Sequence, residues 1–236
     1  MDNENKLSFL NKYIFIKDAQ VELIKSNEIV DENVPQLWKQ IIAINNSSER
    51  VSRIVQQWKD VIGEELRNTI SYLEEFLEDV EVMRIGSKYY LLYSIKNSSN
   101  KILYYTGGNP LEENFKNHEE LKRDWRNVPS KLCEFYEILH DGFYYFPSRS
   151  MGIDSIENIT YLDDYEWSII EEENIKPDID LARSYGFFSN GMGMYVVLDL
   201  TNESPNQAVL WSAKKAPRYN LDFWAIVDEW IVMGFE

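Results

Sequence analysis

The chain has 236 residues, and 44% of them are hydrophobic, which is enough to build a core without cross-links. Its single cysteine, Cys133, excludes an intramolecular disulfide and a zinc cage made of cysteines, as is typical of a reducing compartment. The net charge is −16, and residues 141–236 alone contain 17 acidic and 6 basic residues. Such a field repels nucleic acid and anionic membranes, so a protein with a basic face is the better candidate partner, although solubility alone would also explain it.

The beginning of the chain carries no targeting signal that we recognise. The first residues, MDNENKLSFL, lack the basic start and the apolar stretch of a secretory signal. No run approaches the roughly 20 apolar residues that are needed to cross a bilayer. We therefore expect a cytoplasmic protein without a membrane partner, and the sequence does not predict its oligomeric state.

Residues 1–80 are predicted to be mostly helical. Between residues 51 and 77 the apolar positions recur at intervals of three and four, which is typical of one buried helix face. Gly63 lies inside this pattern, and we expect it to bend or divide the helix. The positions of the face are Val51, Ile54, Val55, Trp58, Ile62, Leu66, Ile70, Leu73 and Leu77.

The next segment, up to TGGNP at 106–110, changes period. Its aromatic and β-branched runs, separated by GSK and KNSSNK, predict a β-hairpin or meander. We place a domain boundary near residue 108, which divides the chain into a helical region with a hairpin (1–108) and a second domain (109–236). The sequence does not say what the first part does.

The second part begins with helix-prone segments and continues into strands. VPSKLCEFYEIL predicts a helix with Pro129 in its first turn, and Gly142 can end it in a left-handed conformation. The run 194–200 and QAVLWS predict two strands of a hairpin. The chain ends in a predicted amphipathic helix that Asn220 would cap. Its buried stripe is Phe223, Trp224, Val227, Trp230 and Ile231.

Two glycines, Gly191 and Gly193, precede the strand at 194–200. A phosphate-binding glycine motif would instead follow a strand and open a helix. The third glycine of that motif is also missing, because Val196 stands in its place. These glycines therefore indicate a turn that needs a positive φ or a close backbone approach.

The sequence contains few groups for catalysis or metal binding. The two histidines, His118 and His140, have no second histidine or cysteine near them, so a zinc site would need mostly carboxylates, and no G-x-S-x-G motif is present. Cys133 and His140 are seven residues apart on one predicted helix, about 10 Å and too far for direct proton transfer. We expect Cys133 to pack in the core and His140 to end a helix, satisfied by the backbone and the dipole. No cofactor, metal or catalytic residue is predicted.

An acidic segment follows residue 160 and is open to three interpretations. It can be a solvated surface, a protein-binding surface with Trp167 as a core residue or contact anchor, or a set of catalytic or metal-binding carboxylates. A calcium loop would require a central glycine, which is absent. The carboxylates are Asp163, Asp164, Glu166, Glu171, Glu172 and Glu173.

The order of motifs in residues 110–236 resembles the SUKH superfamily of Smi-type domains, which includes many bacterial immunity proteins. The matching stretches are VPSKLCEFYEILHDGF, MGIDSIENI, FFSNGMGMYVVLDL, AVLWS and YNLDFWAIVDEWI. Val128 stands where the family has leucine, and residues 1–108 have no counterpart. The matching positions are Pro129, Asp141, Gly142, Gly152, Gly191, Gly193, Asp199, Phe223 and Trp224.

The resemblance implies an α+β fold with a central antiparallel sheet flanked by helices, here preceded by a mostly helical region. It also implies a non-enzymatic domain that binds and neutralises a cognate polymorphic toxin, often a nuclease with a basic cleft. We hypothesise that the acidic segment contributes to the toxin-binding face. The alternatives are a scaffold of the same fold without a toxin and a hydrolase that uses Asp163 or Glu171 as acid or base.

Overall fold

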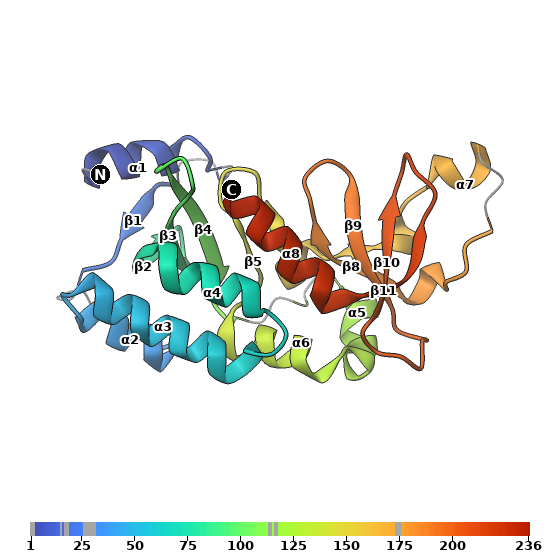
Figure 1. Ribbon diagram of the computed structural model, residues 1–236, viewed down its shortest axis with the longest axis horizontal. Coiled ribbons are helices and arrows are strands. Elements are labelled where there is room, and N and C mark those ends of the chain that lie inside the picture. The colour runs from blue at the N-terminus through green and yellow to red at the C-terminus, as the bar shows by residue number, and fades with distance from the viewer. Residues whose placement is uncertain are drawn as a thin grey trace.

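The computed structural model describes residues 3–14, 16, 19–25, 32–112, 115, 118–170 and 176–236 in full, and the backbone of residues 171 and 172. In these residues helices flank one antiparallel sheet, so the predicted α+β class is confirmed (Figure 1). The part before residue 77 is mostly helical, also as predicted. No helix in the described part of the chain combines the length and the apolar composition needed to cross a bilayer.

The bounds of the elements are as follows. The α-helices are α1 (Asn3–Asn11), α2 (Gln36–Ala43), α3 (Ser47–Ile62), α4 (Arg67–Phe76), α5 (Glu119–Asp124), α6 (Ser130–Glu134), α7 (Ser168–Glu172) and α8 (Phe223–Phe235). The strands are β1 (Val21–Leu23), β2 (Leu77–Ile85), β3 (Lys88–Lys96), β4 (Ile102–Gly108), β5 (Phe143–Tyr145), β6 (Ser150–Ile153), β7 (Thr160–Tyr161), β8 (Ser184–Ser189), β9 (Met194–Asp199), β10 (Gln207–Ser212) and β11 (Arg218–Asp222).

The strands form a single sheet in the order β1-β2-β3-β4-β5-β6-β8-β9-β10-β11, with β7 paired to β8 beside this path. The predicted meander is β2-β3-β4, and the predicted hairpin is β9-β10. At the centre β4 pairs with β5 through Thr106 and Tyr144, so the sheet is continuous across residue 108. The two proposed domains share this sheet, and their division remains a prediction.

The helix face predicted between residues 51 and 77 is divided at Gly63, where α3 ends and a turn leads to α4. Leu77 was placed on this face, but it begins β2 instead. The first turn of α4 is capped from a distance, because the Asp228 carboxylate of α8 accepts the backbone N–H groups of Asn68 (3.0 Å) and Thr69 (2.8 Å). This contact satisfies donors that every helix start leaves open.

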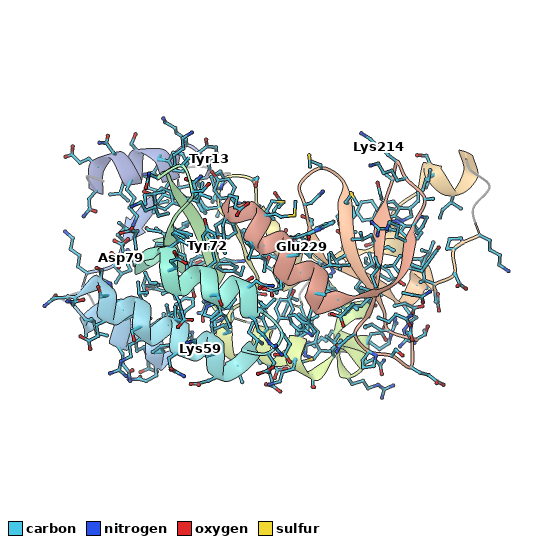
Figure 2. The ribbon with its side chains drawn as sticks, viewed as in Figure 1. Tyr13, Lys59, Tyr72, Asp79, Lys214 and Glu229 are labelled. Atoms are coloured by element: carbon cyan, nitrogen blue, oxygen red, sulfur yellow. The ribbon has the colours of Figure 1, made fainter. Side chains whose placement is uncertain are left out.

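The final helix, α8, crosses the front of the sheet in Figure 1 and packs beside α4. The rings of Tyr72 and Phe235 join the two helices with their centroids 5.0 Å apart, and Figure 2 labels Tyr72. Asn220 was predicted to cap α8, and this is wrong: Asn220 lies in β11 with φ +58°. Asp222 is the cap, and its side chain accepts the N–H of Ala225 at 2.8 Å.

The main core lies between the helices, among them α3, α4 and α8, and one face of the sheet. Strand residues alternate between the two faces, so Val82 and Leu91 enter the main core while Met83 and Leu92 point to the other face. Trp58 of α3 lies 4.9 Å from Phe143 of β5, centroid to centroid. The main core therefore contains residues from both sides of residue 108.

The other face of the sheet carries two smaller clusters. Near the N-terminus, Leu10 of α1 packs on Met83, Leu92 and Tyr104. At the opposite end of the molecule, residues 162–170 pack on Val197, Val209 and Trp211 of β9 and β10. Figure 1 shows the distance between these covers, with α1 at the left end and α7 at the right end.

His140 ends the helical segment 135–139, as predicted, and the backbone of Gly108 hydrogen-bonds its ring. The sequence did not predict that the ring is fully buried. The hydroxyl of Tyr93 accepts the indole N–H of Trp58 (3.0 Å) and lies 2.6 Å from Nε2 of His140. Burial lowers the pKa of His140 to about 3, so the ring is neutral at neutral pH.

Candidate protein-binding surface

The acidic segment rests on a small aromatic platform at the β9-β10 end of the sheet. The ring of Trp167 meets that of Trp211 edge to face, with centroids 5.6 Å apart and planes at 85°. Its indole N–H donates to the backbone carbonyl of Leu162 at 2.8 Å, and the residue is only 7% exposed. Trp167 is thus a core residue that fixes the segment to the sheet, and any direct contact with a partner remains a prediction.

The residues between Leu162 and Trp167 point to solvent. Asp163, Asp164 and Glu166 are exposed, and Tyr165 between them is 58% exposed. None of the three carboxylates is in an ion pair with another residue of the described part. We call these three residues the acidic surface, a concentration of negative charge on a backbone that Trp167 holds in place.

The charge around the acidic surface extends to the neighbouring helix α5. Burial raises the pKa of Tyr161, and the charge of Asp163 is the next cause. Glu120 of α5 and Asp164 raise it further, while Arg123 lowers it. Glu120 therefore adds to the negative potential at this place, and Arg123 of the same helix offsets part of it.

A buried carboxylate ties α5 to the sheet beside the acidic surface. Asp124 is 2% exposed, and its Oδ2 accepts a hydrogen bond from the Tyr185 hydroxyl at 2.9 Å. The same oxygen lies 2.9 Å from Nε of Arg183. Tyr185 also stacks on Tyr161 at 5.2 Å. Nothing in the local sequence pattern singles out Asp124, whose partner Tyr185 is 61 positions away.

A pocket of about 380 Å³ opens directly at the acidic surface. Glu166 gives it a negative rim, and its walls expose polar and apolar surface in similar amounts. It is lined by Tyr165, Glu166, Trp167, Ser168, Ile170 and Leu181.

The remaining predicted carboxylates are not placed. The backbone of α7 includes Glu171 and Glu172, but their side chains lie outside the described residues, and so does the whole of Glu173. Their contribution to the acidic surface remains a prediction.

The predicted motif glycines serve the fold. Gly191 (φ +73°) and Gly193 (φ +82°) form the turn between β8 and β9, which confirms the positive-φ prediction. Gly142 has φ +77°, and a Cβ on Gly152 would lie 1.9 Å from the Phe143 carbonyl oxygen. Gly142 and Gly152 thus lie together where β5 meets β6, and Gly191 contacts the β6 residue Ser150.

The other motif positions are structural as well. Pro129 stands at the start of α6, and Phe223 and Trp224 are buried at the start of α8. Asp199 caps a turn after β9, where its Oδ1 accepts the N–H of Thr201 at 2.9 Å. Cys133 is partly buried against the main core, as predicted, and burial raises the pKa of its thiol to about 11. These residues do not meet at the acidic surface.

The described carboxyl groups with the largest pKa changes are buried and do not belong to the acidic surface. Burial raises the pKa of Asp141 to about 7, although its Oδ1 accepts the N–H of Ile156 at 2.8 Å. Burial also raises the pKa of Asp154 well above its usual value. Among the described residues, no group of three His, Cys, Asp or Glu side chains could hold a metal ion. The hydrolase alternative named Asp163 and Glu171, and the described one, Asp163, is exposed.

Comparison of the chain with protein-family models, with curated proteins and with solved structures found no match. The SUKH family assignment therefore remains a prediction from the sequence motifs.

Proposed function

We propose that this protein is a non-enzymatic protein-binding domain that acts as an immunity protein and neutralises a cognate toxin. The observation that carries the proposal is the acidic surface: Asp163, Asp164 and Glu166 are exposed and without ion-pair partners in the described part of the chain. Trp167 fixes their backbone on the sheet. The resemblance of residues 110–236 to the SUKH superfamily supports the same function.

The charge of this surface suits a partner with a basic face. Fixed negative charges accelerate encounter with a positive partner and can raise the association rate by one or more orders of magnitude at low salt. A nuclease toxin fits this description, because its cleft must bind the phosphate chain. An inhibitor that presents carboxylates there would compete with the substrate.

The geometry also favours binding over catalysis. A carboxylate hydrolase needs two acidic groups facing a substrate pocket, with one pKa raised. Asp163 is exposed, and the two buried carboxyls with strongly raised pKa values, Asp141 and Asp154, are not among the three residues of the acidic surface; Asp141 already bonds the backbone of Ile156. These contacts suit a structural role for Asp141 and a surface role for Asp163.

The first test is growth of cells that express the product of the adjacent gene, with and without this protein, followed by a pull-down. Rescue together with a stable complex supports the immunity function and identifies the partner. Toxicity without rescue or binding contradicts this pairing. A partner that is recovered without any toxicity favours the scaffold alternative.

The second test concerns the surface itself. The triple variant Asp163→Lys, Asp164→Lys, Glu166→Lys is compared with a matched variant that carries lysine at three other exposed acidic positions, Glu75, Glu203 and Glu229. We expect the first variant to slow association with the partner at least about tenfold at low salt and to flatten its salt dependence. The matched variant should have a smaller effect, and equal effects would contradict the proposed surface.

A further inference from the structure

The pocket beside the acidic surface has two kinds of wall. Ile170 and Leu181 provide aliphatic contact, while Tyr165 and Trp167 provide aromatic contact, with ring centroids 5.7 Å apart. Its volume of about 380 Å³ is within the range of pockets that hold small ligands or single side chains. Trp167 is held by its bond to Leu162, so this wall is formed before any partner arrives.

The charge at the rim selects among the groups that could enter. Glu166 lines the pocket, and Asp163 and Asp164 precede it within the same exposed segment. An acidic side chain would be repelled there, and a purely apolar one would leave the charge without a partner. A side chain with an apolar stem and a cationic head satisfies both the walls and the rim.

Arginine fits this combination better than lysine. Its planar guanidinium can stack on an aromatic ring and can form two parallel hydrogen bonds with one carboxylate. Lysine carries a compact, strongly hydrated charge that does neither as well.

We propose that this pocket receives an arginine side chain from the partner protein, with the guanidinium at Glu166 and the stem against Ile170 and Leu181. The inference rests on the proposed protein-binding function and identifies the chemistry of the contact. Arginine is one of the residue types most often found among the few residues that dominate the affinity of an interface, and such residues typically fill pockets on the partner.

The test uses a probe that does not depend on the toxin. The tripeptide acetyl-Gly-Arg-Gly-amide is titrated into the full chain labelled with 15N, and the indole signal of Trp167 and the amide signals of 165–170 are followed. We expect saturable shifts confined to this segment, and at least about threefold weaker binding when citrulline replaces arginine, since citrulline keeps the shape but loses the charge. Lysine should also bind more weakly.

Two variants complete the test. Glu166→Gln should weaken binding of the arginine peptide about as much as citrulline does, whereas Glu203→Gln, at an exposed position on another loop, should leave it unchanged. The Trp167 indole signal without peptide reports whether each variant is still folded. Absence of saturable shifts up to roughly 10 mM peptide, or equal binding of citrulline, would overturn the proposal.

The outcome is distinguishable from failure of the proposed function. If the peptide binds as expected but the adjacent gene product is neither toxic nor captured, the pocket stands and the immunity function fails. If the toxin is neutralised but the peptide does not bind, the function stands and the arginine pocket is wrong.

Discussion

The face of the sheet opposite the main core is covered by one packed segment at each end. The two segments differ in whether their charged side chains are buried or exposed. At the N-terminal end, the ammonium of Lys6 in α1 is buried, forms an ion pair with Glu81 and donates to the Ser94 hydroxyl at 3.2 Å. At the opposite end, Trp167 covers the sheet while the carboxylates beside it remain exposed. The charge of Lys6 therefore helps to hold α1 on the sheet, whereas the carboxylates beside Trp167 are free to contact solvent or a partner.

This difference follows from burial. A charged group that is removed from water must be paired or neutralised, whereas an exposed group needs no partner within the fold. His140, which is buried between the two ends, is likewise neutral in the core, because burial lowers its pKa to about 3. The exposed carboxylates are consequently available to bind a partner, because the fold does not need them to be paired.

The largest expected effect comes from removing the two apolar covers. Trp167→Ala and Leu10→Ala should each destabilise the protein by about 3 kcal/mol, because both side chains are buried. Chemical denaturation measures these losses. Only Trp167→Ala should also weaken partner binding under conditions where both variants are folded. Equal loss of binding in both variants would contradict the division of roles between the ends.

Two neighbouring buried groups should give opposite pH dependences of stability. The pKa of His140 is lowered to about 3 by burial, so between about pH 6.5 and 3 the unfolded chain binds a proton that the native chain does not, and stability falls as pH falls. The pKa of Asp141 is raised to about 7, so the native chain holds the extra proton and stability falls as pH rises from about 4 to 7.

Single variants separate these contributions, each of which has a slope of at most about 1.4 kcal/mol per pH unit. The stability of Asp141→Asn relative to the unmodified protein should increase from pH 4 to 7, and that of His140→Gln should decrease from pH 4 to 6.5. Urea unfolding at half-unit pH steps measures both slopes. Parallel curves for a variant and the unmodified protein would show that the residue does not titrate as burial implies.

A smaller loss is expected from Lys6→Met, which keeps the apolar stem but leaves Glu81 without its cation. We expect a destabilisation of about 1–3 kcal/mol, because the ion pair is largely covered by α1. The matched control is Lys12→Met, at an exposed position just after the same helix, which should change stability by less than about 0.5 kcal/mol. Similar values for the two variants would mean that the ion pair does not hold α1.

The smallest effect on stability is expected at the acidic surface. Neutralising Asp163, Asp164 and Glu166 to the corresponding amides should change the free energy of unfolding by less than about 0.5 kcal/mol per site, since all three are exposed. Thermal and chemical unfolding would reveal a larger loss. Such a loss would show that these carboxylates stabilise the fold and are not spared for a partner.

Local pattern was sufficient for much of this architecture. Period 3.6 predicted the face of α3 and α4, apolar runs predicted the hairpin of β9 and β10, and Gly63 correctly marked the division between two helices. The turn at Gly191 and Gly193 was predicted because a glycine can adopt a positive φ at little cost. The capping of α8 was not, since Asn220 and Asp222 are equally good caps by type and only the backbone path selects one.

The candidate site was predicted only in part. The acidic composition of residues 163–166 was evident, but the burial of Trp167 required Trp211, which comes from a strand 44 positions later. The pocket likewise needs Leu181, which lies beyond α7. Sequence patterns predict which residues share a face of one helix or strand, and they do not predict contacts between residues that are far apart in the chain.

The sequence by itself determined the α+β class, the acidic character of the C-terminal part and the positions of the main turns, because these depend on composition and on short-range periodicity. The tertiary structure decided that one sheet crosses residue 108, that Asp228 caps a helix 159 positions away, and that His140 is a neutral core residue. It also decided which carboxylates remain exposed. The physical reason is that burial is a property of the packed chain, and burial determines whether a polar group must be paired within the fold or is free to bind another molecule.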